Sequence, residues 1–310
     1  MKNALITIGC LLLAIHLANC QLVLPEASLT LRVTDEKGTP LVGASAGIGK
    51  SVYGDGSSRG LTDADGLYTG TLRNTGSLFY GAKMTGFYSA GGEYFFKQGA
   101  MKGDATEWNT RRWEPWNPTV EVVLKEKGPQ RPMYAKRIRT IELPGSKNSI
   151  GYDFELGDWV APHGKGKTVD LIFTGTGEVA KGTYRLQWTF SNPGDGIRVM
   201  PLDPGARSEL KSPKEAPAEG YAPSLEINSE GRVVGADGRL GDRPACFLFR
   251  VRTVLDEKGK VVSAHYGKMY PEQLNVVYYL NPEPNSRSLE FDPARNLFGE
   301  LPGSGRINDY

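Results

Sequence analysis

The chain has 310 residues, of which 37 are basic and 35 acidic, for a formal net charge of +2. This balance gives no reason to expect nucleic acid or a strongly acidic partner. The 39 glycines and 20 prolines are typical of a chain with many tight turns and not of a helical one. The length suits two domains of ordinary size.

Residues 1–20 have the three parts of a secretory signal: a basic start at Lys2, an apolar run, and small residues at its end. The run from Ala4 to Ala18 is shorter than the roughly 20 residues that a helix needs to span a bilayer, which argues against a permanent membrane anchor. No later apolar stretch of the sequence approaches that length. We therefore predict an extracytoplasmic protein, in the periplasm, on the cell surface or secreted.

The end of this segment leaves two processing outcomes open. Cleavage after Cys20 would place Ala18 and Cys20 at the small-residue positions of a signal-peptidase site. Alternatively, Leu17-Ala18-Asn19-Cys20 resembles a bacterial lipobox, in which the cysteine is acylated and retained as the first residue, although Asn19 departs from the usual Gly or Ala. Lipidation at Cys20 would be the only expected attachment to a membrane.

Three cysteines occur, and two of them, Cys10 and Cys20, belong to the export segment. The remaining Cys246 cannot form an internal disulfide alone, so the fold must be held by its core. Cys246 opens an apolar run that extends to Phe249, which favours a buried structural thiol over a nucleophile.

A first β-sandwich domain is predicted over residues 28–126. Leu29, Leu31 and Val33 alternate with polar residues, which is the period of a half-buried strand. Turn residues separate the later runs at the spacing typical of a sandwich. These runs are Gly66–Leu72, Ser77–Lys83, Glu93–Lys97 and Thr119–Leu124.

A polar stretch at 125–132, with Pro129 and Pro132, predicts a linker to a second β-rich domain of unknown family over 133–310. The same Asp-Glu-Lys-Gly turn occurs at Asp35 and at Asp256, where it joins two alternating runs in a predicted hairpin. Pro201–Ser224 is rich in proline and polar residues and predicts a long surface excursion. The strongest strands are Val169–Thr174, Thr183–Ser191, Phe247–Leu255, Lys260–Tyr266 and Leu274–Leu280. The predicted class is all-β, with two β-sandwich domains.

Two motifs of the first domain carry a family resemblance. Their residues are Val33, Asp35, Gly38, Pro40, Leu41, Gly43 and Ala44, then Thr62, Asp63, Asp65, Gly66 and Tyr68. On these residues the N-terminal third resembles the carboxypeptidase regulatory-like domains, a transthyretin-like branch of small β-sandwiches. The resemblance implies a hairpin turn at each motif and a folding, spacing or binding role. It is interrupted by a Gly- and Ser-rich stretch at 47–60 and by an unusually long stretch at 99–118.

The resemblance does not imply peptidase activity. A zinc carboxypeptidase needs a His-x-x-Glu element and a further histidine, but neither His163 nor His265 is followed by Glu at that spacing. Residues 62–66 resemble a fragment of a calcium loop without its completing Glu. Residues 158–167 lack the spacing of a phosphate-binding loop. We expect no metal and no cofactor.

The most suggestive binding feature is the stretch 107–117, which contains Trp108, Arg111, Trp113 and Trp116. Exposed indoles beside guanidinium and amide donors could stack on sugar rings and bond their hydroxyls. The alternative is a loop folded over an open end of the sandwich, in which the indoles extend the core. The general tendency of aromatic residues to be buried favours this alternative.

A second candidate lies at Asp158, Trp159 and His163. In a catalytic interpretation, His163 is a general base oriented by Asp153 or Asp158. No G-x-S-x-G nucleophile motif occurs in the sequence. Its absence favours the other interpretation, a glycine-rich strand connection with an exposed histidine.

Glycoside cleavage needs only two acids about 5–10 Å apart, and Asp153, Glu155, Asp158 and Asp170 could supply such a pair. Because no complete catalytic motif occurs, we predict instead a non-enzymatic exported protein that acts in binding or assembly at the cell envelope, with a glycan or a protein as partner. The alternative is a glycan-active hydrolase with the N-terminal sandwich as an accessory module.

Overall fold

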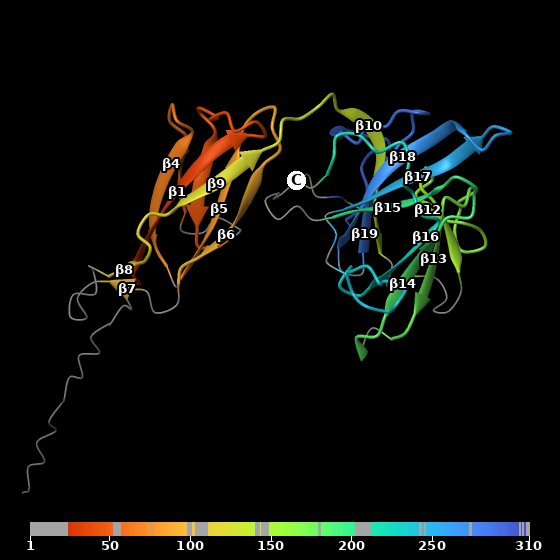
Figure 1. Ribbon diagram of the computed structural model, residues 1–310, viewed down its shortest axis with the longest axis horizontal. Helices are drawn as coiled ribbons and strands as arrows, with labels where there is room; N and C mark the ends of the chain where they lie inside the picture. Colours follow the sequence, from red (N-terminus) through yellow and green to blue (C-terminus); the bar gives the residue numbers. More distant parts are fainter. Residues whose placement is uncertain are drawn as a thin grey trace, which may run out of the picture.

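Within the described part of the chain the named elements are all β-strands, which confirms the predicted all-β class. They form two lobes side by side, each built of two sheets (Figure 1). The predicted export segment with Cys20 lies outside the described residues, and within them no helix has the length and apolarity needed to cross a membrane. The computed structural model describes residues 24–51, 57–74, 76–97, 101–102, 111–139, 143, 149–178, 181–201, 212–241, 244, 246–272, 275–303, 305 and 307.

The first lobe is a sandwich of two sheets. One has the order β4-β1-β8-β7, with β9 also paired to β1, and the other has the order β3-β2-β5-β6. Its strands are β1 (Glu26–Asp35), β2 (Ser45–Gly49), β3 (Ser58–Leu61), β4 (Leu67–Arg73), β5 (Ser77–Lys83), β6 (Ala90–Phe95), β7 (Met101–Lys102), β8 (Arg112–Trp113) and β9 (Thr119–Leu124). β1, β4, β5 and β9 lie where the alternation predicts them. Glycines obscure β2, β3 and the start of β6, because glycine has low strand propensity.

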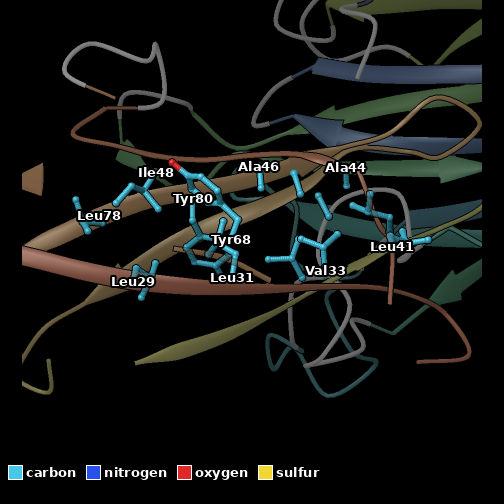
Figure 2. Packing of buried hydrophobic residues seen from close by; sticks show 14 of the residues in the cluster. Leu29, Leu31, Val33, Leu41, Ala44, Ala46, Ile48, Tyr68, Leu78 and Tyr80 are labelled. Carbon is cyan, nitrogen blue, oxygen red and sulfur yellow. The ribbon is translucent and has the colours of Figure 1, made fainter. Parts of the chain in front are cut away.

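The core of the first lobe lies between these sheets. Leu29, Leu31 and Val33 of β1 are fully buried, as a strand with one face on a core requires. Figure 2 shows them opposite Ile48 of β2 and Tyr80 of β5. Fully burying such a side chain contributes roughly 1.5–3 kcal/mol, so this alternation fixes which face of each strand points outward.

The two Asp-Glu-Lys-Gly turns close with the same hydrogen bonds. Oδ1 of Asp35 accepts from the backbone N–H groups two and four residues later, at 2.8 Å each. Oδ1 of Asp256 accepts the equivalent pair at 2.9 and 2.8 Å. Gly38 and Gly259 have φ angles of +82° and +76°, which glycine adopts without steric cost. The predicted reuse of one turn chemistry is confirmed.

The second lobe is also a two-sheet sandwich. Its sheets have the orders β15-β17-β18-β19-β10-β20 and β12-β11-β13-β14-β16. The strands are β10 (Arg131–Arg139), β11 (Ile150–Asp153), β12 (Asp158–Trp159), β13 (Leu171–Thr176), β14 (Arg185–Thr189), β15 (Gly196–Met200), β16 (Ser224–Asn228), β17 (Cys246–Leu255), β18 (Val261–Glu272), β19 (Asn275–Asn281) and β20 (Phe291–Asn296). β17 and β18 form the predicted hairpin.

Aromatic residues fill the core of the second lobe. The indole of Trp188 is fully buried and meets Phe173 and Phe247 edge-on, at ring centroid distances of 6.4 and 5.0 Å. Cys246 is fully buried, as expected of a structural thiol. The sequence predicts a surface excursion at 201–224. The described part of this segment is instead packed on the lobe, because Ala216 is buried in a cluster with Cys246.

A buried ion pair joins the two lobes. Nζ of Lys125 lies 3.7 Å from a carboxylate oxygen of Glu290, and both side chains are at most 5% exposed. The other carboxylate oxygen accepts from Tyr88 Oη at 2.7 Å and from the Gly128 N–H at 3.1 Å. Lys125 also donates to the backbone carbonyl of Ser212. The chain between the lobes is therefore attached to the second lobe by an ion pair and hydrogen bonds.

Every strand pair of the described residues lies within one lobe. β10 begins at Arg131, inside the stretch 125–132 that the sequence predicts as a linker, and Lys125 at its start is buried. The domain bounds 28–126 and 133–310 stay predictions.

The Lys125→Met substitution should destabilise the protein by about 3 kcal/mol in urea unfolding, because it leaves the Glu290 carboxylate buried without its cation. The double variant Lys125→Met/Glu290→Gln removes both charges and keeps an acceptor for Tyr88. It should recover most of that loss, since replacing a whole buried pair is often neutral. Equal stabilities of the single and double variants would contradict this role of the ion pair.

Candidate functional site

A groove of about 690 Å³ lies on the outer face of the sheet β3-β2-β5-β6. Ile48 of β2 and Tyr80 of β5 point into the core, so the residues next to them along each strand point outward. On this face one row of outward positions consists of glycines, and the groove is open to solvent along the sheet.

Three glycines form the floor of the groove. Gly47 of β2 pairs with Gly81 of β5, and Gly81 pairs with Gly91 of β6, so the three lie side by side in one row across the sheet. A Cβ on Gly91 would lie 2.4 Å from the carbonyl oxygen of Tyr80, whereas a Cβ on Gly81 would meet nothing closer than 3.4 Å. Gly91 therefore permits close approach of the backbones, and Gly81 leaves space above the sheet empty.

Larger residues flank this row on both sides. Phe79 pairs with Glu93 on one side, and Ser45 pairs with Lys83 on the other. Each flanking row is two residues away along the strands, or roughly 7 Å. Arg59 of β3 lies opposite Gly47 at the end of the glycine row. The hydroxyl-bearing residues that also line the groove are Ser51, Ser57 and Ser89.

The groove thus combines a floor of glycine backbone, one aromatic ring, hydroxyl groups and charges of both signs. At the Gly47 end of the floor the Arg59 side chain lies close, since its Cγ would be 2.9 Å from a Cβ on Gly47. Tyr88, next to the lining residue Ser89, donates to Glu290 of the second lobe. None of the groove's residues is among the predicted site residues. One feature of the sequence could have pointed to this groove. Isolated glycines inside alternating runs indicate bulges or close approach of the backbone.

Of the predicted tryptophan platform, the structure describes Trp113 and Trp116, and their indoles have different environments. Trp113 is 9% exposed, packs against Phe96 at 6.2 Å between ring centroids, and donates its Nε1–H to the Asn74 carbonyl at 3.2 Å. Trp116 is 38% exposed, and the guanidinium of Arg112 lies 5.3 Å from its ring centroid. The Trp113 indole is thus part of the core and presents no open face for a sugar ring.

The backbone of this loop is bonded to the first strand. Trp108 lies outside the described residues, and the carbonyl of Arg111 accepts the backbone N–H of Glu26 at 2.9 Å. Oδ1 of Asn117 accepts the hydroxyl groups of Ser28 and Thr30 at 3.1 and 2.9 Å. These bonds hold the loop against β1.

Asp158, Trp159 and His163 lie near one another in the second lobe without forming a catalytic arrangement. The Asp158 carboxylate accepts the backbone N–H groups of Trp159 at 2.8 Å and Lys165 at 2.9 Å, so it closes its own loop. Trp159 packs edge-on against the core ring of Tyr152 at 5.0 Å. His163 is exposed, and no hydrogen bond or ion pair links it to either predicted orienting carboxylate among the described contacts.

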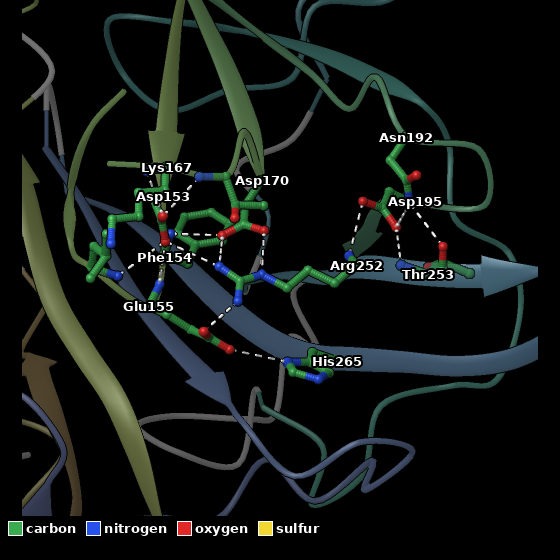
Figure 3. Close-up of polar contacts among 12 residues, drawn as sticks. Asp153, Phe154, Glu155, Lys167, Asp170, Asn192, Asp195, Arg252, Thr253 and His265 are labelled. Atoms are coloured by element: carbon green, nitrogen blue, oxygen red, sulfur yellow. Dashed lines mark hydrogen bonds and ion pairs between the residues drawn. The ribbon is translucent and has the colours of Figure 1, made fainter. Parts of the chain in front are cut away.

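The other predicted carboxylates converge on Arg252 (Figure 3). Nε of Arg252 lies 2.9 Å from Asp170, and its Nη2 lies 3.1 Å from Asp153. Its Nη1 contacts Glu155. Asp153 ends β11 and Asp170 directly precedes β13 in one sheet, and Arg252 belongs to β17 of the other, so the ion pairs cross-link the two sheets of the lobe.

A bulge in β17 directs Arg252 into this cluster. The register to β18 shifts between Val251 and Val254, and Arg252 has a φ of +55°, an uncommon conformation for a residue with a side chain. The carboxylate of Asp195 accepts the N–H groups of Arg252 at 3.0 Å and Thr253 at 2.8 Å, which holds the bulge. The alternation of the sequence contains no sign of this bulge.

The charges of the cluster are mutually dependent. Burial raises the pKa of Asp170 above its ordinary value, despite its bonds to Arg252. Burial acts in the same direction on Asp153, but backbone N–H donors and Arg252 outweigh it and lower its pKa. Burial also lowers the pKa of His265, whose Nδ1 lies 3.5 Å from Glu155. All three carboxylates are thus engaged by Arg252, and no metal-binding group of acidic, His or Cys residues occurs in the described part of the chain.

Comparison with known proteins identifies no family. No family model and no curated protein matches the chain, so the carboxypeptidase regulatory-like resemblance stays a prediction, whereas the β-sandwich architecture stands on the strands themselves. A hydroxyquinol 1,2-dioxygenase from Pseudomonas putida is similar at 14% identity and a TM-score of 0.24 over 34% of this chain, which spans 57% of the enzyme's length.

Two further solved structures are similar over most of the chain. A DUF3823 family protein from Parabacteroides merdae has 8% identity and a TM-score of 0.24, over 87% of this chain and 100% of that one. A Bacteroides uniformis protein described provisionally as carbohydrate binding has 9% identity and a TM-score of 0.22, over 84% of this chain and 99% of that one. Likenesses this weak assign no function to this chain.

The Arg252→Met substitution should destabilise the protein by about 3 kcal/mol at pH 7. This is the lower end of the range for removing one partner of a buried ion pair, because the guanidinium is partly exposed. Without Arg252, the folded-state pKa values of Asp153 and Asp170 rise. A carboxyl group whose pKa is higher in the folded state than in the unfolded state destabilises the fold when it is ionised, and this effect disappears once it is protonated. The loss of stability in the variant should therefore shrink as pH falls from about 6 to about 3.

Urea unfolding across this pH range measures the deficit. Arg185→Met is the matched control, because Arg185 forms an exposed pair with Glu226 at 2.9 Å and should change stability by under about 0.5 kcal/mol. A deficit of the same size at every pH would mean that packing of the side-chain stem, and not charge, is what Arg252 contributes.

Proposed function

We propose that this is an exported, non-enzymatic binding protein of the cell envelope, and that the groove on the sheet β3-β2-β5-β6 binds a glycan. The observation that carries the proposal is the row of Gly47, Gly81 and Gly91. Three adjacent strands lack a side chain at the same level of the sheet. Glycine in a strand interior weakens the strand, so its repetition at one level has a cost that a ligand site would explain.

The shape and chemistry of the groove favour a saccharide. A floor without side chains can accept the flat face of a sugar ring, and Phe79 offers an aromatic surface beside it. The hydroxyl, carboxylate and cationic groups around the floor can bond sugar hydroxyls. A volume of about 690 Å³ lies within the ordinary range of ligand sites.

Two features support a binding function over the alternative of a glycan hydrolase. Hydrolysis of a glycosidic bond ordinarily needs two carboxyl groups flanking that bond. Glu93 is the one acidic residue among the described residues that line the groove. The predicted acids Asp153 and Asp170 lie in the other lobe and are bound to Arg252.

The cellular setting of the proposal comes from the sequence. The export segment at 1–20 supports an extracytoplasmic location, and Cys20 is the proposed point of attachment if the chain is lipidated. The partner would then be an envelope or extracellular glycan, and the near-neutral charge gives no support for nucleic acid.

The Gly81→Leu substitution should abolish glycan binding and leave the fold intact. The space above Gly81 accepts a Cβ, and a side chain in a strand stabilises it by about 0.5–1 kcal/mol relative to glycine, so stability should stay equal or rise. Binding is measured on an array of envelope and extracellular oligosaccharides, and stability by thermal unfolding. Thr119→Leu is the control, because it adds the same side chain at an exposed position of β9 in the opposite sheet.

Two results would contradict the proposal. One is unchanged glycan binding by a well-folded Gly81→Leu variant. The other is the absence of any array signal for the natural chain.

A further inference from the structure

We infer that the glycan bound in this groove is acidic, and that Arg59 and Lys83 hold its carboxylate. The inference rests on the proposed function and names the class of ligand that the groove takes. It starts from two exposed cations that lie on the same face as the glycine floor, Arg59 on β3 and Lys83 on β5.

The register places these two cations where one anion can contact both. Arg59 lies opposite Gly47, Lys83 lies opposite Ser45, and β2 runs between their strands. Strand spacing and rise put the two Cα atoms on the order of 12 Å apart. Both side chains are long and rise from one face, and the residues between them, Gly47 and Ser45, are too small to separate them.

Neither cation has an acidic partner within the described part of the chain. Elsewhere the pattern differs: Arg32 on β1 lies directly opposite Glu121 on β9, with an N–O distance of 3.6 Å. Arg59 and Lys83 instead have glycine and serine opposite them. Two like charges at one side of an open groove, with no acidic residue directly opposite either of them on the sheet, favour an anionic ligand there.

A negative charge at the far side of the groove, opposite in sign to Arg59 and Lys83, determines which end of the ligand lies at which side. Glu93 pairs with Phe79, on the side of the glycine row away from Lys83, at a distance on the order of 14 Å between the Cα atoms of Glu93 and Lys83. A carboxylate would be repelled there, whereas a sugar hydroxyl can donate to it. One carboxylate therefore lies at Arg59 and Lys83, and the face of an adjoining ring lies on the glycine floor beside Phe79, with its own carboxylate turned away from Glu93.

The chemistry of the cations suits a uronic acid. The guanidinium of Arg59 can bond both oxygens of a carboxylate in parallel, and the ammonium of Lys83 supplies a point charge. A uronate-containing oligosaccharide presents that carboxylate on the rim of a pyranose ring, together with the hydroxyls that the rest of the groove can bond. We therefore assign the groove to short uronate oligosaccharides.

The test compares trigalacturonate with its methyl ester, which has the same rings without the charges, by isothermal titration of the mature chain. Trigalacturonate should bind at least about tenfold more tightly, since one charge-assisted hydrogen bond is enough for a tenfold difference. Arg59→Gln and Lys83→Gln should each weaken trigalacturonate binding about tenfold and leave ester binding unchanged. Arg32→Gln is the control for loss of a surface cation and should change neither.

The outcomes separate this inference from the proposed function. Equal binding of trigalacturonate and its ester would overturn the acidic ligand and leave a glycan site in place. Equal binding of triglutamate, a peptide of the same charge, would overturn the sugar class. If neither saccharide binds, the inference is wrong, and the array with Gly81→Leu then decides on the proposed function alone.

Discussion

Burial of alternate side chains between two sheets is the constraint on which the rest of this protein depends. In the first lobe, Ile48 and Tyr80 must face Leu31 across the sandwich, so Gly47 and Gly81 must face outward. A shift of one residue in the register would exchange the two faces. The groove is therefore a consequence of the core, and the same contacts that stabilise the lobe hold the floor of the groove in place.

Charge is used in two different ways in the two lobes. In the second lobe, Arg252 contacts three carboxylates and joins the sheets, and at the junction Lys125 meets Glu290 away from solvent. These charges are satisfied within the protein. Around the groove, Arg59 and Lys83 have no acidic neighbour in the described part of the chain, which leaves them to a ligand. Asp153, Glu155 and Asp170, which the sequence offered as acids for glycoside cleavage, are all engaged by Arg252.

The sequence was informative where hydrophobic alternation was strong. It predicts the class and strands such as β1 and β9, together with the turns at Asp35 and Asp256, because these depend on neighbours along the chain. It did not predict the groove, because the three glycines are 34 and 10 residues apart in sequence and meet only through strand register. The bulge at Arg252 was hidden for the same reason, since Asp195 comes from another element. The tryptophan stretch was conspicuous in composition, but Trp113 contributes its area to the core.

The most direct measurement of the central claim is the change in backbone amide chemical shifts when trigalacturonate is added to the isotopically labelled mature chain. If the glycine row is the floor of the ligand site, the largest changes should belong to Gly47, Gly81 and Gly91, with smaller ones in Phe79 and Lys83. Changes concentrated in the loop at 111–117 or in the second lobe, with the three glycines unaffected, would contradict it.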